Sequence, residues 1–147
     1  MPGRHMGKKL GEILIQSGAL SEDELSRAID FQRREGGLLG EILVKLGYVT
    51  EHDIVRALTT QYGFPYLPLD NYDFKKDMEK VIPENVARQY RIIPLDIIGN
   101  ILTVVMSNPL NDKAIEDIEM ITKKKVQVFI STLTSIHMAL DKLYGVR

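Results

Sequence analysis

The chain has 147 residues, of which 44% are hydrophobic and 27% charged, and its formal net charge is −1. A balance this close to neutral gives no basic face for nucleic acid, and the absence of cysteine excludes disulfides and thiolate metal sites. The most apolar stretch is broken by Pro94, Asp96 and Gly99, so it cannot span a bilayer, which takes about 20 apolar residues.

The first six residues, MPGRHM, indicate the remnant of an expression tag in front of a natural start at Met6, so residues 1–6 are left out of the fold prediction. From there the chain repeats itself. The stretch LGEILIQSGALSEDELSRAIDFQ, Leu10–Gln32, returns 29 residues later as LGEILVKLGYVTEHDIVRALTTQ, Leu39–Gln61. This internal repeat predicts two copies of one supersecondary unit that bury their apolar faces together.

Each copy predicts a short first helix that starts at its Leu-Gly pair. The helix ends just before Gly18 in the first copy and Gly47 in the second, because a glycine suits the left-handed cap that closes many helices. The glycine at the start of each helix, Gly11 or Gly40, lets another group approach the backbone closely. It is either a plain N-cap or a place where helix N–H groups meet an anion.

The second helix of each copy starts with a capping box. Ser21 is followed three residues later by Glu24, and Thr50 by Asp53. Apolar residues then recur at helical spacing, and a glutamine, Gln32 or Gln61, continues each stripe. We therefore expect residues 7–62 to form a four-helix lobe with pseudo-two-fold symmetry.

A change of composition follows at residues 63–74, where two prolines indicate a linker with an edge strand or extended piece at Tyr66–Leu69. Beyond it the patterns alternate between helix and strand. We predict a weak helix over 74–81, a helix over 83–90, strands over 91–98 and 101–106 joined by a tight turn, a helix over 111–122, a strand over 126–130 and a closing helix over 132–144. In the helix over 111–122 we expect Ile115, Ile118 and either Ile121 or Met120 to face inward.

The second lobe, residues 75–147, therefore has about three strands with helices packed on them, and the fold class of the whole chain is α+β.

Two interpretations of the repeat remain open from the residues alone. Its apolar positions are either simply the core of the lobe or, in part, the walls of a binding site: Leu10, Leu14, Leu25, Ile29, Leu39, Leu43, Ile54 and Leu58. The amides of Gln32 and Gln61 either find partners inside the lobe or face a shared ligand. Two equivalent half-sites suit a dimeric partner or a ligand with two equal halves, such as a cyclic dinucleotide.

At these residues the sequence resembles the MshEN domain, the amino-terminal domain of type II secretion and type IV pilus assembly ATPases. The cyclic-di-GMP motif of that family has 24 residues and occurs twice with five residues between. Here the copies are Lys9–Gln32 and Leu38–Gln61, with the spacer Arg33–Gly37. Downstream, Ile82-Pro83-Glu84, Ala87–Tyr90, Pro94-Leu95 and Met106–Leu110 resemble the same domain.

The resemblance implies that each motif holds one half of a cyclic-di-GMP molecule. The ligand-binding residues that it implies are Lys9, Leu10, Gly11, Leu14, Leu25, Ile29 and Gln32 in one half-site, Leu38, Leu39, Gly40, Leu43, Ile54, Leu58 and Gln61 in the other, and Arg88 and Asn108 from the second lobe. No metal is implied.

Five positions depart from the family motif, and two of them are Ala19 and Tyr48, which replace aliphatic residues. Lys9 and Leu38 stand where the family has arginine, and lysine keeps the charge but loses the planar fork that pairs with a guanine edge or a phosphate. Asn108 stands where the family often has aspartate. These changes leave three outcomes open: binding with lower affinity, asymmetric binding, or none.

The leading prediction is a cytoplasmic regulatory domain that binds cyclic-di-GMP and acts on a secretion or pilus ATPase core. The alternative is a docking domain without nucleotide, which attaches the ATPase to an inner-membrane platform or an actin-like adaptor protein and is thereby held at the inner membrane. A sizeable exposed apolar patch on the second lobe would favour the alternative.

The sequence offers no support for an enzyme. It has no G-x-x-x-x-G-K-[ST] motif, and His52 and His137 stand alone on helices. No catalytic triad, metal-spaced cluster or carboxylate dyad stands out. The run Lys123–Lys125 is most simply a solvated turn, with an acidic partner or a lipid headgroup as the other interpretation.

Overall fold

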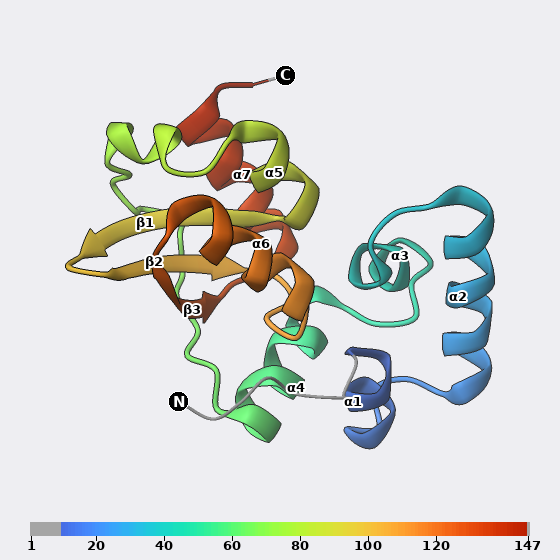
Figure 1. Cartoon of the computed structure of the whole chain (residues 1–147). Coiled ribbons are helices and arrows are strands. Elements are labelled where there is room, and N and C mark those ends of the chain that lie inside the picture. Colours follow the sequence, from blue (N-terminus) through green and yellow to red (C-terminus); the bar gives the residue numbers. More distant parts are fainter. Residues whose placement is uncertain (1–9, 147) are drawn as a thin grey trace. The chain divides into compact units, whose positions relative to one another are not determined.

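The computed structural model describes residues 10–146 and divides the chain between Gly63 and Phe64 into two compact units (Figure 1). The described part contains seven α-helices, one 3-10 helix and three strands. The predicted α+β class is therefore confirmed. Within residues 10–146, no helix is long and apolar enough to cross a bilayer.

The first unit consists of the four predicted helices. They are α1 (Leu10–Gln16), α2 (Glu22–Glu35), α3 (Leu39–Lys45) and α4 (Glu51–Tyr62). Both predicted capping boxes are present: the Ser21 and Thr50 side chains accept from the backbone N–H groups three residues later, and the acidic partners close the boxes. Gly18 and Gly47 have φ of 83° and 77°, which confirms that both short helices end at a left-handed glycine.

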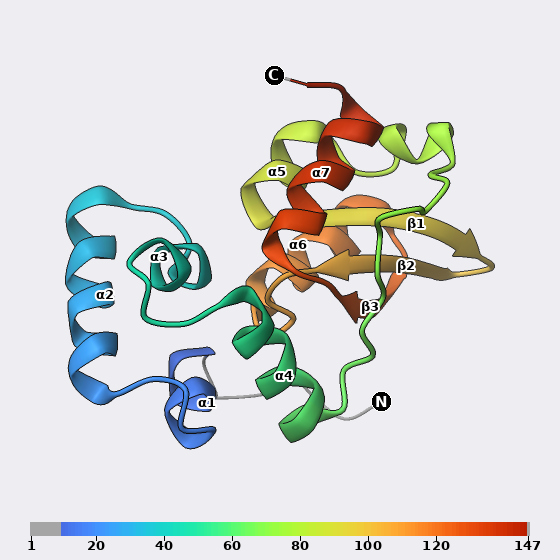
Figure 2. The same ribbon diagram turned by 180° about the vertical axis from the view of Figure 1, so that it is seen from behind.

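The helices of the first unit pack across the two repeats. The most extensive contacts join α2 with α3 and α1 with α4, while α1 and α3 touch each other between them (Figures 1 and 2). Seven-residue helices are too short to be stable alone in water, so α1 and α3 depend on these contacts.

Two glycines make the close packing of the first unit possible. A Cβ added at Gly11 would lie 2.6 Å from Cδ1 of Leu25, and one added at Gly40 would lie 3.2 Å from Cδ2 of Leu10. Leu25 and Leu10 thus occupy space that any larger residue at these glycines would take. This assigns the Leu-Gly pairs a packing role, whatever else they contact.

The second unit is a three-stranded sheet with helices on both faces. Its elements are η1 (Lys76–Lys80), α5 (Glu84–Tyr90), β1 (Ile92–Ile98), β2 (Ile101–Met106), α6 (Asp112–Thr122), β3 (Lys125–Ile130) and α7 (Leu133–Tyr144). The strand order is β1-β2-β3, with β1 antiparallel and β3 parallel to β2. Figures 1 and 2 show α6 on one face of the sheet and α5 and α7 on the other.

The segment 63–74, predicted as a linker, contributes to the second unit. Tyr66 forms a single parallel bridge with Ile130, and Leu69 is buried in the core. The Tyr72 and Phe74 rings, with centroids 4.9 Å apart, pack against the same core. Apolar residues in a stretch without regular periodicity thus anchor it to the sheet.

Some predictions about the second unit were wrong in detail. The weak helix over 74–81 is a short 3-10 helix, and Pro83 precedes α5 as its N-cap rather than opening it. Met120 and Ile121 do not face inward: they are 68% and 45% exposed. Ala114, Ile115 and Ile118 form the buried face, and each further step of three residues turns about 60° away from it.

We predict that Gly11→Ala destabilises the first unit through Leu25. Overpacking costs about 1–3 kcal/mol, which exceeds the roughly 0.5–1 kcal/mol that alanine gains over glycine in a helix. In a Leu25→Ala background the clash is gone, so Gly11→Ala should be stabilising there. Urea unfolding of the four proteins of this double-mutant cycle measures the change of sign. Equal effects in both backgrounds would contradict the contact.

Candidate functional site

Most of the apolar motif residues are core residues in this structure. Gly11 is also buried, and Lys9 lies outside the described residues. The buried side chains, each at most 5% exposed, are Leu10, Leu14, Leu43, Ile54 and Leu58. At these five positions the packing interpretation describes what the side chains do.

The remaining motif residues form an accessible set. Six are half-buried, and Gln61 is exposed. The six are Leu25, Ile29, Gln32, Leu38, Leu39 and Gly40. Most of them lie on α2 and on the start of α3, two helices in extensive contact. A ligand can reach these residues without opening the core.

The two motif glutamines are hydrogen-bonded within the first unit. Gln32 Nε2 donates to the carbonyl of Gly37 at 3.0 Å, and Gln61 Nε2 donates to the carbonyl of Ile13 at 3.3 Å. Of the two interpretations left open by the sequence, bonding within the lobe therefore describes the amide nitrogens here. Each amide oxygen is a separate hydrogen-bonding group, and this leaves both side chains with chemistry to offer a ligand.

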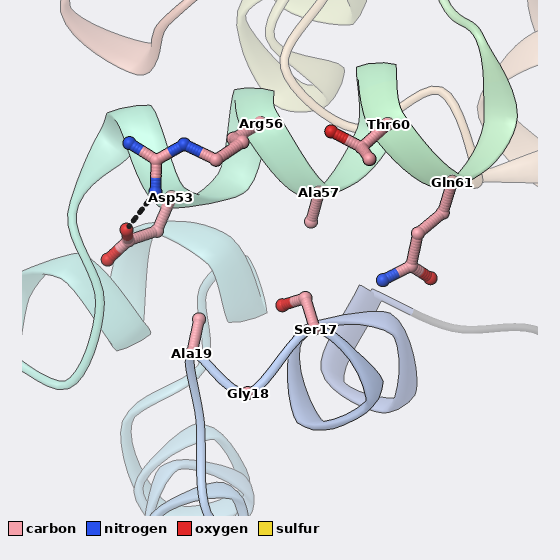
Figure 3. A pocket seen from close by; sticks show the side chains of 8 residues that line it. All are labelled: Ser17, Gly18, Ala19, Asp53, Arg56, Ala57, Thr60 and Gln61. Atoms are coloured by element: carbon pink, nitrogen blue, oxygen red, sulfur yellow. Dashed lines mark hydrogen bonds and ion pairs between the residues drawn. The ribbon is translucent and has the colours of Figure 1, made fainter.

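A pocket of about 440 Å³ lies between α4 and the turn that joins α1 to α2 (Figure 3). Figure 3 shows Gln61 pointing from α4 toward α1, with Ala57 between the polar residues of the helix. The lining residues are Ser17, Gly18, Ala19, Asp53, Arg56, Ala57, Thr60 and Gln61. Only Gln61 belongs to the ligand set predicted from the sequence.

Polar groups of several kinds surround this pocket. Arg56 Nη1 lies 3.5 Å from Asp53 Oδ1, and the Arg56 side chain is 72% exposed, so this ion pair is weak. Ser17 Oγ donates to the carbonyl of Leu14 at 2.9 Å. The pocket can therefore offer a cation, hydroxyl groups and an amide around a small apolar floor.

The pocket breaks the symmetry of the repeat. Its small lining residues Ser17, Ala19 and Thr60 correspond, 29 positions away, to Leu46, Tyr48 and Phe31. The Phe31 ring reaches the last turn of α3, since its centroid lies 5.4 Å from Lys45 Nζ. At these three positions, therefore, one half carries aromatic or aliphatic side chains where the other half carries small residues that line the pocket.

This pocket was not predicted from the sequence, because the motif consists of the residues that the two copies have in common. The signal that would have found it is the difference between the copies: three positions at which one copy is small and the other bulky. Ala19 and Tyr48 do stand out as departures from an aliphatic pattern, but their opposite sizes carry the information.

The two predicted site residues of the second unit have partners there. Arg88 donates through Nε to Glu84 at 2.8 Å, through Nη1 to Asp141 at 3.1 Å and through Nη2 to the carbonyl of Gly145 at 2.7 Å. The hydrogen bond to Glu84 raises the pKa of Arg88 further. Arg88 thus joins α5 to the end of α7, and three of its five N–H groups are engaged there.

Asn108 lies in the turn between β2 and α6. Its Oδ1 accepts the backbone N–H of Leu110 at 3.1 Å, which leaves its amide nitrogen as the group able to donate elsewhere. Among residues 10–146, no group of histidine and carboxylate side chains is arranged to hold a metal ion.

Comparison with known proteins identifies a family and several relatives to which this chain is similar. The model of the MshEN domain matches residues 62–147, more than half of the chain. The type IV pilus assembly ATPase PilB of Myxococcus xanthus is 30% identical over 140 residues, which are 95% of this chain and 25% of that protein. PilB of Thermus thermophilus is 30% identical over 139 residues, 93% of this chain and 16% of that protein. The chain thus spans a quarter or less of these relatives.

Two solved structures are also similar. A structure of MshE with cdg (cyclic-di-GMP) has 27% sequence identity and a TM-score of 0.68, over 93% of this chain and 99% of that chain. A structure of the N-terminal domain of XpsE has a TM-score of 0.74 over 99% of this chain and 100% of that chain. Its identity is 19%, so this likeness concerns the fold alone.

We predict opposite responses at the two equivalent positions Phe31 and Thr60. Phe31→Thr removes a half-buried ring and should lower the free energy of unfolding by about 1–3 kcal/mol. Thr60→Phe places the same ring beside an existing pocket. This change should lower the free energy of unfolding by less than about 1 kcal/mol, or raise it. Urea unfolding measures both. Equal losses would show that the two halves are packed alike.

We also predict a structural role for Arg88. Arg88→Met removes three hydrogen bonds, two of them to carboxylates, and should destabilise the second unit by about 1–3 kcal/mol. Arg33→Met is the matched control, because Arg33 is 77% exposed and, within residues 10–146, pairs only with Asp30, which is also exposed. Its effect should stay below about 0.5 kcal/mol. If Arg88→Met left the free energy of unfolding unchanged, the structural role would be contradicted and Arg88 would again be a candidate ligand contact.

Proposed function

The chain belongs to the MshEN domain family, and from that premise we propose that its helical repeat is a cyclic-di-GMP-binding regulatory element of a type II secretion or type IV pilus assembly ATPase. The tandem motif carries the proposal: two copies of 24 residues, separated by five, supply the same side chains twice. A ligand with two equal halves matches this duplication. The likeness to MshE with cyclic-di-GMP supports the choice of ligand.

The accessible motif residues offer a ligand both apolar and polar contacts. Leu25, Ile29 and Leu39 offer half-buried aliphatic surface on which a purine base can lie. The oxygens of Gln32 and Gln61 accept hydrogen bonds from base N–H groups. Gly40 is half-buried and has no side chain, so its backbone can approach a phosphate closely.

The two halves of the site bind their halves of the ligand unequally in this proposal. Leu38 removes the charge that the family has in the second motif, and Lys9 keeps only a point charge in the first. Asymmetric binding is therefore the outcome that we favour among the three left open by the sequence.

Regulation follows if the ligand prefers one arrangement of the two units. The two units meet in the chain between Gly63 and Phe64. Asn108 is kept in this proposal as a ligand contact from the second unit, because its amide nitrogen is able to donate. The ligand can shift such an equilibrium only by as much as its affinities for the two arrangements differ. The partner that receives the change is an ATPase core in the cytoplasm, consistent with the PilB relatives.

A second candidate is a docking domain that binds no nucleotide. The observation in its favour is the distribution of apolar surface: in residues 10–146, every exposed large hydrophobic side chain lies in the second unit. Such a domain would attach the ATPase to an inner-membrane platform or an actin-like adaptor without any role for the repeat beyond packing.

We predict saturable one-to-one binding of cyclic-di-GMP to the chain, measured by isothermal titration calorimetry, with GTP and cyclic-di-AMP as competing ligands. The double variant Gln32→Ala/Gln61→Ala should weaken binding roughly tenfold or more, because it removes two hydrogen-bonding groups. Gln89→Ala, at an exposed position of α5, is the matched control and should bind as the unaltered chain does.

Thermal unfolding of each variant separates loss of binding from loss of fold. Absence of heat and of any thermal shift at high ligand concentration would reject nucleotide binding and favour the docking domain. Binding that the double variant retains in full would leave the ligand in place but reject the glutamines as its contacts.

A further inference from the structure

One end of the sheet in the second unit carries exposed apolar side chains. Ile98 is 73% and Ile101 is 40% exposed at the turn between β1 and β2. Met120 and Ile121, in the last turn of α6, are 68% and 45% exposed. These four are a majority of the seven large hydrophobic side chains exposed in residues 10–146. Scattered single apolar residues need no explanation, but a gathering of this kind indicates an interaction surface.

Backbone contacts hold the two apolar pairs at the same end. Ile98 pairs with Ile101, and Ile101 pairs with Lys125 across the sheet. The N–H of Lys125 donates to the carbonyl of Asn100 at 2.9 Å, so the start of β3 is tied to the hairpin turn. The N–H of Val126 donates to Glu119 Oε2 at 3.0 Å, which ties the last turn of α6 to the same strand.

Three consecutive lysines stand between these apolar pairs. Lys123, Lys124 and Lys125 connect α6 to β3, and none of their ammonium groups has an ion-pair partner among the described residues. Two carboxylates of neighbouring elements are engaged elsewhere: Glu119 of α6 accepts from the backbone of β3, and Asp96 of β1 pairs with Lys75 at 2.7 Å. The end of the sheet is therefore cationic as well as apolar. We call Ile98, Ile101, Met120, Ile121 and Lys123–Lys125 the hairpin end.

We propose that the hairpin end binds an anionic phospholipid bilayer. Apolar side chains enter the boundary between headgroups and acyl chains, and long lysine side chains extend toward the phosphates. The hairpin turn projects beyond the helices that cover the sheet (Figure 1). A projecting turn suits insertion into a fluid surface, whereas a specific protein interface needs about 800 Å² of matched area on each partner.

This proposal is independent of nucleotide binding. It requires no ligand in the first unit, and its residues are all in the second unit. Failure of the calorimetric test would therefore leave it standing, and the reverse holds as well.

The test is partition of the whole chain onto sedimented vesicles. We predict binding to vesicles of equimolar phosphatidylglycerol and phosphatidylcholine and none to phosphatidylcholine alone, with the bound fraction falling as salt is raised. The triple variant Lys123→Gln/Lys124→Gln/Lys125→Gln should lower the partition coefficient roughly a hundredfold, from about fivefold for each lysine. Ile98→Ser/Met120→Ser should lower it roughly tenfold.

A matched control removes the same charge elsewhere. Arg33→Gln/Arg34→Gln/Lys45→Gln changes the net charge equally, but all three residues lie in the first unit. This control should keep the partition coefficient within about threefold of the unaltered chain. Equal losses in both triple variants would show that net charge alone is responsible and overturn the proposal.

Two other results would overturn the proposal. One is the absence of binding to anionic vesicles in low salt. The other is the absence of binding to vesicles together with binding to polyglutamate through Lys123–Lys125, which would assign the surface to an acidic protein instead. Circular dichroism of each variant confirms that the fold is kept.

Discussion

The packing of each repeat against its twin is the constraint on which the first unit depends. Two seven-residue helices cannot persist alone, so α1 and α3 must be held by α4 and α2 from the other copy. The Leu-Gly pairs make this possible, because Gly11 and Gly40 leave room for Leu25 and Leu10. Most residues of the motif that resembles a ligand-binding motif therefore serve to pack the first unit. A ligand can contact only the motif residues that this packing leaves accessible.

Duplication followed by change at a few positions explains why the two halves differ. The caps, the glycines and the core residues must be kept in both copies, since each copy completes the other. Positions on the outer side of the helix pairs are free of this packing constraint. Phe31 and Thr60 can therefore diverge without loss of the fold, and the smaller residue, Thr60, lines the pocket beside α4. A two-fold symmetric ligand on this lobe would meet unequal surroundings.

Local signals in the sequence predicted the elements of the fold well. The capping boxes at Ser21 and Thr50 and the hairpin at residues 99–100 fix helix starts and strand pairing through neighbouring residues alone. Facts that depend on distant residues were not accessible. The inward face of α6 depends on what it packs against, so Met120 and Ile121 were misplaced. Of the residues that line the pocket, the sequence analysis named only Gln61 as a ligand contact, and neither the pocket nor the hydrogen bonds of Arg88 follow from spacing.

The glutamine contacts bear on how a ligand would gain its affinity. Gln32 and Gln61 already donate one N–H each, to Gly37 and Ile13, so a ligand that takes over these two N–H groups exchanges one hydrogen bond for another and gains little. The second N–H of each amide and the amide oxygens are the groups that add interactions. Most of the binding energy must then come from bases lying on Leu25, Ile29 and Leu39 and from phosphate contacts, while the glutamines decide which base is accepted. Polar groups that are already satisfied in the free protein thus confer selectivity more than strength.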